Sequence, residues 1–288
     1  MTKFKLCAFA DEADAQIDMQ IKALSDNGIP CIELRGVNGR NISELTLDEA
    51  KALRKQLDNG NISVWSIGSP IGKISITDDF APHYALFLHV LELAKILGAS
   101  CIRMFSFYVP SGKTDTNQAD TYKDKVFSRL TQFSDAAKDI GITLCHENEK
   151  GIFGDNAERC AAIHAAFGDI KAVFDPANFV QCGQDTAEAW ALLAPYVQYL
   201  HIKDAFADGA VVPAGHGDGN LREIIAQFGV NGGAMLSVEP HLAVFSGLDA
   251  LENGEKSVIG GANGAGKYEY PSGRAAFDAA VAALREII

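Results

Sequence analysis

The stretch TLCHENE, residues 143–149, decides the fold: a short apolar run ends in acidic and amide side chains. Three later stretches have the same form, namely AVFD at residues 172–175, YLHI at 199–202 and AMLSVE at 234–239. Apolar runs of this length, bounded by turn-forming residues, predict buried β-strands. Each stretch therefore predicts a strand with a polar side chain at or near its C-terminal end.

Similar apolar runs precede these four, so the chain contains eight predicted strands. They are Lys5–Phe9, Cys31–Arg35, Ser63–Ile67, Cys101–Phe105, Thr143–Glu147, Ala172–Asp175, Tyr199–Ile202 and Ala234–Glu239. The longer segments between them have apolar residues at helical spacing, and several end in glycine, as at Gly98 and Gly141. The sequence therefore alternates strand and helix along its length.

Strict alternation of strands and helices demands a parallel sheet, and eight pairs in 288 residues close most naturally into a barrel. We predict an α/β fold, a (β/α)8 TIM barrel that forms a single domain over residues 1–288. A doubly wound open sheet is the rival fold, but no GxGxxG motif follows the first strand. Glycine-rich residues 260–266 lie instead in a long segment from Phe245 to Gly273, either a lid or a plain loop.

Composition and charge narrow the classes of partner. The chain has 37 acidic and 25 basic residues, a net charge of −12, which repels phosphate backbones and anionic membrane surfaces. We therefore expect neither nucleic acid nor membrane as a partner. The first residues show no secretory signal, and six cysteines without a CxxC pair predict reduced thiols in the core. A cytoplasmic location is the expectation.

Four polar side chains stand at the ends of successive predicted strands: Glu147, Asp175, His201 and Glu239. Their spacings are each close to one strand–helix unit, which in a barrel places all four at the C-terminal mouth. Three carboxylates and one imidazole form a donor set that suits a divalent metal ion, Mn²⁺ first, with Mg²⁺, Co²⁺ or Zn²⁺ also compatible. This pattern predicts a metal site with open positions for substrate oxygens.

Six further residues are candidates for substrate binding, because they share the inward side of a strand or follow a strand end. They are Glu33, Arg35, Arg103, Asn178, Lys203 and His216. Each also has a structural interpretation. The charged strand residues could form ion pairs inside the barrel, Asn178 could cap a helix, and His216 could lie in a surface loop.

At these residues the sequence resembles the xylose isomerase-like TIM-barrel superfamily, the sugar phosphate isomerase/epimerase group that includes ketose 3-epimerases, inosose dehydratase and inosose isomerase. The resemblance runs from the first strand to the last helix. It is carried by the four ordered ligand residues together with HIKD at 201–204, GHGDG at 215–219 and SVEP at 237–240. It implies a divalent metal held by the four side chains, with Glu147 and Glu239 as acid/base catalysts, and it is compatible with a homo-oligomer.

The resemblance implies proton transfer at the carbon next to a carbonyl of a small sugar or cyclitol, through an enediolate. Ketose 3-epimerases have a histidine where this sequence has Asn178, and an arginine near the positions of Lys203 and His216, which argues against a simple ketohexose substrate. A dehydratase of a keto-sugar or inosose is the alternative on the same scaffold.

Two other classes are weaker. A non-catalytic sugar-binding barrel would not need the complete ligand set. Endonuclease IV shares the fold but needs extra histidines on the early strands, where this sequence has Ser66, Gly68 and Arg103.

Overall fold

A computed structural model describes residues 4–110, 116–245 and 268–288. The long segment that the sequence analysis singled out as a lid or a plain loop falls mostly outside these residues. The glycine-rich stretch 260–266 lies outside them altogether.

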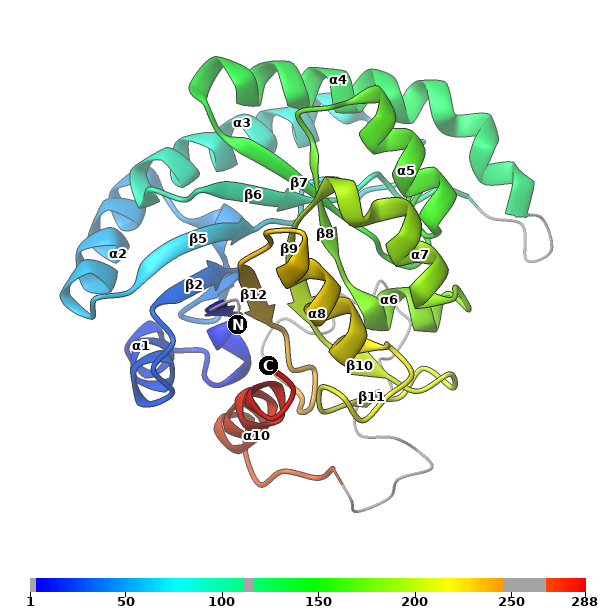
Figure 1. The fold of residues 1–288 in the computed structure, drawn as a ribbon. Helices are drawn as coiled ribbons and strands as arrows, with labels where there is room; N and C mark the ends of the chain where they lie inside the picture. Colours follow the sequence, from blue (N-terminus) through cyan, green and yellow to red (C-terminus); the bar gives the residue numbers. More distant parts are fainter. Residues whose placement is uncertain (1–3, 111–115, 246–267) are drawn as a thin grey trace.

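Eight strands form one parallel sheet that curves into a nearly closed barrel (Figure 1). The order in the sheet is β1-β12-β9-β8-β7-β6-β5-β2, and β1 and β2 lie side by side where the barrel closes. The strands are β1 (Lys5–Ala8), β2 (Cys31–Leu34), β5 (Ser63–Gly68), β6 (Cys101–Met104), β7 (Thr143–Glu147), β8 (Lys171–Phe174), β9 (Val197–Ile202) and β12 (Met235–Val238). The predicted (β/α)8 TIM barrel is confirmed.

Helices follow the strands and surround the barrel as an outer layer (Figure 1). They are α1 (Ile17–Asp26), α2 (Leu47–Asn59), α3 (Phe80–Leu97), α4 (Lys123–Ile140), α5 (Ala157–Ala166), α6 (Pro176–Gln181), α7 (Thr186–Leu193), α8 (Leu221–Val230) and α10 (Gly273–Arg285). Two short hairpins pair β3 (Gly36–Val37) with β4 (Arg40–Asn41) and β10 (Asp204–Ala205) with β11 (Val211–Val212). Short 3-10 helices cover Ala10–Glu12, Ile42–Glu44, Thr116–Tyr122 and Ala194–Tyr196.

The ends of the helices follow from local sequence. Thr46 caps α2 in a capping box with Glu49, so each satisfies a backbone N–H of the other. Gly98 and Gly141 end α3 and α4 with φ of 66° and 72°, a left-handed conformation that glycine adopts without a steric penalty. Both glycines stand where the sequence predicts a helix to stop.

Side chains alternate between the inside of the barrel and the helical layer. The lower part of the interior holds a small apolar cluster made of Cys7, Cys101, Cys145, Val173, Tyr199 and Met235. Because inward positions recur every second residue, the next inward residue after Cys145 is Glu147, and the one after Tyr199 is His201. The interior thus changes from apolar to charged toward the C-terminal mouth. The six cysteines, all among the described residues, are free thiols.

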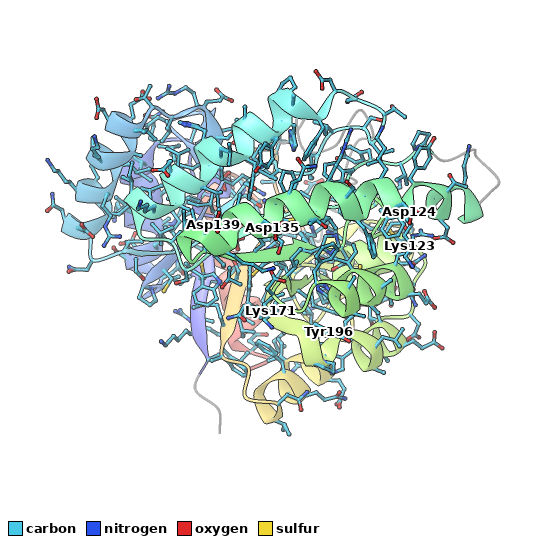
Figure 2. All side chains as sticks on the ribbon, turned by 90° about the horizontal axis from the view of Figure 1, so that it is seen from above. Lys123, Asp124, Asp135, Asp139, Lys171 and Tyr196 are labelled. Carbon is cyan, nitrogen blue, oxygen red and sulfur yellow. The ribbon has the colours of Figure 1, made fainter. Side chains whose placement is uncertain are left out.

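The outer helices are polar on their exposed side. Asp124, Asp135 and Asp139 follow the outside of α4, where Figure 2 labels them. Within the described part of the chain, one helix, α3, is long and apolar enough to cross a membrane by length and composition. In the barrel, α3 packs between α2 and α4 and against β5 and β6, with Phe87 and Val90 fully buried.

Candidate metal centre

Four buried side chains meet at the C-terminal mouth of the barrel: Glu147, Asp175, His201 and Glu239. Each offers one ligand atom, and these four atoms all lie within 4.8 Å of one another. They come from the ends of β7, β8, β9 and β12, which are neighbours in the sheet. The structure therefore brings the predicted ligand set together.

The end of β8 is held so that one carboxylate oxygen faces the cluster. Asp175 Oδ1 accepts a hydrogen bond from the backbone N–H of Asn178 at 2.9 Å and so caps α6. The side chain of Asn148 accepts from the N–H of Asp175 and donates to its carbonyl, both at 2.9 Å. The two bonds with Asn148 continue the pairing of β7 and β8 beyond the last strand residues. The other carboxylate oxygen, Asp175 Oδ2, is left to face the cluster.

His201 lies in the middle of the acidic side chains. Its Nδ1 is 2.9 Å from Glu147 Oε1, 3.4 Å from Glu239 Oε2 and 3.9 Å from Asp175 Oδ2. The other ring nitrogen, Nε2, is 3.2 Å from Glu33 Oε2. The two nitrogens therefore face different carboxylates, on different sides of the imidazole.

The residues present fit a divalent metal ion. Asp175 Oδ2 is buried and makes no hydrogen bond to any described residue, although Lys203 Nζ lies 2.8 Å from it as an ion pair. A buried carboxylate oxygen is costly unless a cation compensates it, and the Lys203 ammonium does so here without a hydrogen bond, so the lone pairs of Oδ2 are left for an ion. Three carboxylate oxygens and one imidazole nitrogen are the donors that Mn²⁺, Mg²⁺ and Zn²⁺ accept in proteins.

Positive charges around the two glutamates keep both ionised. Burial alone would raise their pKa values, but His201 and Arg103 lower the pKa of Glu147 to about 2. Against the same effect of burial, the ammonium of Lys203 holds the pKa of Glu239 well below its usual range. Both side chains are therefore carboxylates near neutral pH and can accept a proton.

The other two members of the cluster respond differently. Burial raises the pKa of Asp175 to about 7, even though Lys203 opposes the shift. Burial would lower the pKa of His201, but Glu147 and Glu33 hold it well above its usual range. Protonation of His201 and, in part, of Asp175, together with the ammonium of Lys203, therefore balances part of the negative charge of the cluster.

The three predicted cationic residues all pair with carboxylates at the mouth. Arg35 donates to Glu239 Oε1 at 3.0 Å and also to Asp11 and Glu12. Arg103 donates to Glu147 Oε2 at 3.0 Å, and Lys203 donates to Glu239 Oε2 at 3.1 Å.

The guanidinium groups of Arg35 and Arg103 also contact aromatic rings. Arg35 lies 4.4 Å from the centroid of Phe9, and Arg103 lies 4.6 Å from that of Phe105. The ion pairs and the ring contacts together hold the two arginines, and through them the side chains of Glu147 and Glu239, in place.

The remaining three predicted substrate-binding residues differ in their placement. Asn178 is buried and donates to Glu147 Oε1 at 3.3 Å, so it borders the cluster. Glu33 lies below His201, toward the apolar part of the barrel, with no exposed surface on its side chain. His216 is exposed, and its ring lies 5.9 Å from that of Tyr268. The structure brings Asn178 to the site and leaves His216 on the surface loop.

Three residues of the mouth were missed in the sequence. Asp11 and Glu12 lie in the 3-10 helix after β1, and His241 follows Glu239 with a φ of 46°, which is rare for a residue with a side chain. The backbone N–H of His241 donates to Glu12 Oε2 at 2.6 Å. The available signal was the pair of acids directly after the first strand, in the same position as the acids after later strands.

The glycine-rich loop after β9 wraps around Asp204. The carboxylate of Asp204 accepts hydrogen bonds from the backbone N–H groups of Gly215, Gly217 and Gly219 at 2.9 to 3.0 Å. Successive N–H groups that converge in this way form an anion-binding concavity. Here the protein's own aspartate fills it, so the GHGDG motif organises the loop.

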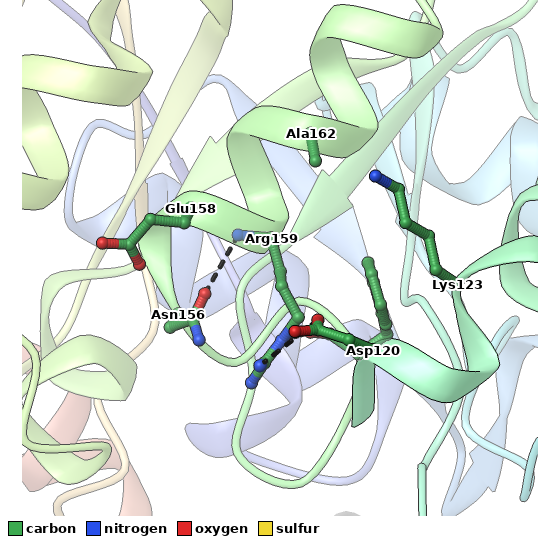
Figure 3. Close-up of a pocket in the computed structure, with 7 residues that line it drawn as sticks. Asp120, Lys123, Asn156, Glu158, Arg159 and Ala162 are labelled. Atoms are coloured by element: carbon green, nitrogen blue, oxygen red, sulfur yellow. Dashed lines mark hydrogen bonds and ion pairs between the residues drawn. The ribbon is translucent and has the colours of Figure 1, made fainter. Parts of the chain in front are cut away.

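A separate hollow of about 540 Å³ lies on the outside of the barrel, near the start of α4 and of α5 (Figure 3). Its walls include Asp120, Lys123, Asn156 and Arg159, and Asn156 accepts from the backbone N–H of Arg159 at 2.9 Å. The residues that line it include none of the predicted site residues.

Comparison with solved structures identifies the same architecture. A D-psicose 3-epimerase studied in the presence of D-fructose is 19% identical with a TM-score of 0.71, and the match covers 98% of this chain and 97% of that one. The IolI protein with a bound zinc atom is 15% identical with a TM-score of 0.71, with coverage of 98% and 97%. The probable 3-DHS dehydratase AsbF from Bacillus anthracis, involved in petrobactin synthesis, is 18% identical with a TM-score of 0.67, with coverage of 82% and 92%.

At these identities the likeness shows the fold. A search of the curated proteins found no match. The family model described as xylose isomerase-like TIM barrel matches residues 21–253, which is most of the sequence. The chain belongs to the xylose isomerase-like TIM barrel family.

Proposed function

We propose that this protein is a divalent-metal-dependent isomerase or epimerase that moves a proton at the carbon next to a carbonyl of a ketose or cyclitol. The observation that carries the proposal is the cluster of Glu147, Asp175, His201 and Glu239, whose ligand atoms lie within 4.8 Å of one another. The metal-dependent character rests on this donor set, with Mn²⁺ as the first candidate. The epimerase and the zinc-bound IolI protein among the similar structures support the class of reaction.

The two glutamates are placed to exchange protons with a substrate at the mouth. Both are ionised near neutral pH, which a general base requires. Glu147 is oriented by Arg103 and Asn178, and Glu239 by Arg35. A divalent ion held by the cluster would supply electrostatic stabilisation to the negative charge of an enediolate.

One glutamate takes the proton from carbon and the other returns one. Return to the opposite face of the same carbon gives an epimer, and return to the neighbouring carbon gives an isomer. Loss of a β-hydroxyl instead gives dehydration. The probable dehydratase among the similar structures favours this second candidate reaction. The mass of the product separates dehydration from epimerisation and isomerisation, because only dehydration removes one water.

Solvent deuterium uptake tests the proposed proton transfer. The protein loaded with Mn²⁺ is incubated in D₂O with D-fructose and, separately, with an inosose, and substrate mass is followed by mass spectrometry. We expect uptake of one deuterium per turnover in the loaded protein. Removal of the metal with a chelator, or the change Glu239→Gln, is expected to reduce the rate at least ~100-fold, the order that general acid–base catalysis supplies.

Glu92→Gln is the matched control, since it makes the same chemical change at an exposed position of α3. It is expected to leave uptake unchanged. Near-normal uptake by Glu239→Gln would remove this residue from the mechanism, and uptake that survives complete metal removal would contradict the metal-dependent reaction.

A further inference from the structure

Glu33 occupies a closed site inside the barrel directly below His201. Its side chain has no exposed surface, and both carboxylate oxygens accept hydrogen bonds from buried groups. Tyr199 Oη donates to Oε1 at 2.7 Å, and Ser237 Oγ donates to Oε2 at 2.7 Å. Tyr199 and Ser237 lie two residues before His201 and Glu239 on their strands, so Glu33 is one layer below the ligand cluster.

This placement does not suit contact with a substrate at the mouth. The imidazole of His201 lies between Glu33 and the cluster, with Nε2 at 3.2 Å from Glu33 Oε2 and Nδ1 at 2.9 Å from Glu147 Oε1. The ring of Phe9 meets the His201 ring edge-on, with centroids 5.2 Å apart. The orientation of the imidazole is therefore fixed from the side and from below.

The two nitrogens of His201 have different tasks in this arrangement. A histidine binds a metal ion through the nitrogen that carries no proton, and the partner of the other nitrogen decides which one that is. Since Glu33 is held as an acceptor by Tyr199 and Ser237, it accepts the N–H at Nε2 of His201. The nitrogen that faces Glu147, Asp175 and Glu239 is then the one left for the ion.

We propose that Glu33 is a positioning residue: it holds the proton of His201 on Nε2 and so presents Nδ1 to a divalent ion. The inference rests on the proposed metal-dependent function and assigns Glu33 a role through His201, in place of direct contact with substrate. Carboxylates placed in this way raise the basicity of a metal-binding histidine, and their loss weakens metal affinity by 10- to 100-fold in comparable sites.

The test compares metal affinity in three proteins. The dissociation constants of Zn²⁺ and Mn²⁺ are measured by competition with a chromophoric chelator for the wild type, Glu33→Gln and Tyr199→Phe. Glu33→Gln keeps the shape of the side chain and removes its charge. We expect affinity to fall about 10- to 100-fold in this variant. Tyr199→Phe removes another partner of the same carboxylate while leaving it against His201, so we expect a much smaller change.

A second measurement reads the position of the His201 proton and its hydrogen bond. In the Zn²⁺-loaded wild type, nitrogen-15 NMR of the His201 ring is expected to show a proton on Nε2 and none on Nδ1. In Zn²⁺-loaded Glu33→Gln, the Nε2 proton is expected to remain but to shift upfield and exchange faster with solvent, because an amide oxygen is a weaker acceptor than a carboxylate. A purely structural role of Glu33 would lower stability without changing the ring signature.

The outcomes separate the two proposals. Equal affinity in Glu33→Gln and the wild type, or a proton on Nδ1 in the loaded wild type, overturns the role of Glu33 alone. Failure of the wild type to bind any divalent ion overturns the proposed function together with it. If Glu33→Gln does not fold, the wild-type Nε2 proton decides the question: a downfield signal that exchanges slowly with solvent supports donation to Glu33, and a rapidly exchanging signal overturns it.

Discussion

Lys203 places a buried ammonium against two of the four candidate ligands. Its Nζ lies 2.8 Å from Asp175 Oδ2 and 3.1 Å from Glu239 Oε2, and its side chain is only 7% exposed. The charge of Lys203 thus compensates carboxylates that a divalent ion would also use. An ion bound by the proposed site would compete with Lys203 for these oxygens, so we expect this residue to limit how tightly the site holds an ion.

Substitution of Lys203 by methionine is expected to have two opposite effects. Metal affinity should rise at least about tenfold, because like charges about 4 Å apart repel by about 4 kcal/mol even at an effective dielectric constant of 20. The free energy of unfolding of the metal-free protein should fall by roughly 3 kcal/mol, since buried carboxylates lose their partner. Chelator competition and urea unfolding measure the two effects.

Lys55→Met on the exposed side of α2 is the control, and we expect neither quantity to change there. Weaker metal binding by Lys203→Met would show that the ammonium supports the ligands instead of competing with the ion.

The sequence predicted the ligand cluster because all four residues stand at strand ends. There, the alternation of side chains gives the direction in which each points, and the strand end gives its position along the barrel axis. For Glu33, only the alternation of side chains along the strand was available. It predicted that the side chain points into the barrel, but not how far below the mouth it lies. Arg35 and Arg103 were predicted on the inward side, where ion pairs now hold them. Asp11 lies in a 3-10 helix of three residues and His241 in a loop after β12, and neither segment is long enough for periodicity to indicate the direction of a side chain.

At the scale of single elements, the loop after β9 depends on close approach of its backbone to Asp204. A Cβ atom at Gly217 would lie 2.5 Å from Asp204 Oδ1 and 2.6 Å from the carbonyl oxygen of Ala205. The second of these neighbours is backbone, which cannot rotate away. The glycine is therefore required by space.

Gly217→Ala is expected to lower the free energy of unfolding by about 1–3 kcal/mol, because overpacking displaces the loop from the aspartate. Urea denaturation measures the loss. Gly168→Ala is the matched control, because among the described residues no atom lies within 4 Å of the Cβ it would add. A Gly217→Ala protein as stable as the control would show that the loop adapts without cost.

The eight barrel strands were predicted to within two residues at each end, since apolar runs bounded by turn residues have few other solutions. The hairpins β3–β4 and β10–β11 were not predicted. Strands of two residues contain a single period of alternation, too little for a pattern to repeat, and their pairing depends on tertiary contacts. The same reason explains why the 3-10 helices left no clear pattern in the sequence.

At the scale of the whole molecule, three buried histidines make stability depend on pH. Burial lowers the pKa of His83 and of His164 to about 4, and that of His146 to about 3. Below pH 6.5 the unfolded chain binds protons that the folded protein does not, so unfolding becomes easier as the pH falls from 6.5 toward 4. Above pH 6.5 these residues add no such dependence.

His164→Asn tests this dependence, because an asparagine amide can replace the N–H that His164 Nδ1 donates to the carbonyl of Ile170 at 3.1 Å. The free energy of unfolding, from urea titrations at pH 7 and pH 5, should fall less in the variant than in the wild type. The expected difference is about 2 kcal/mol, from the shift of the pKa of His164 to about 4. An identical decrease in both proteins would contradict the assignment.

The order of strands in the sheet bears on how the barrel folds. The first strand, β1, is paired with the last, β12, through Lys5 and Met235, and no ladder within the described residues joins β1 to β2. A circular permutant that began at β2 and carried β1 after β12 would make every barrel strand a sequence neighbour of its partner. It would keep all the ladders and lower the relative contact order. Folding slows as contact order rises, so we expect the permutant to fold faster than the natural chain.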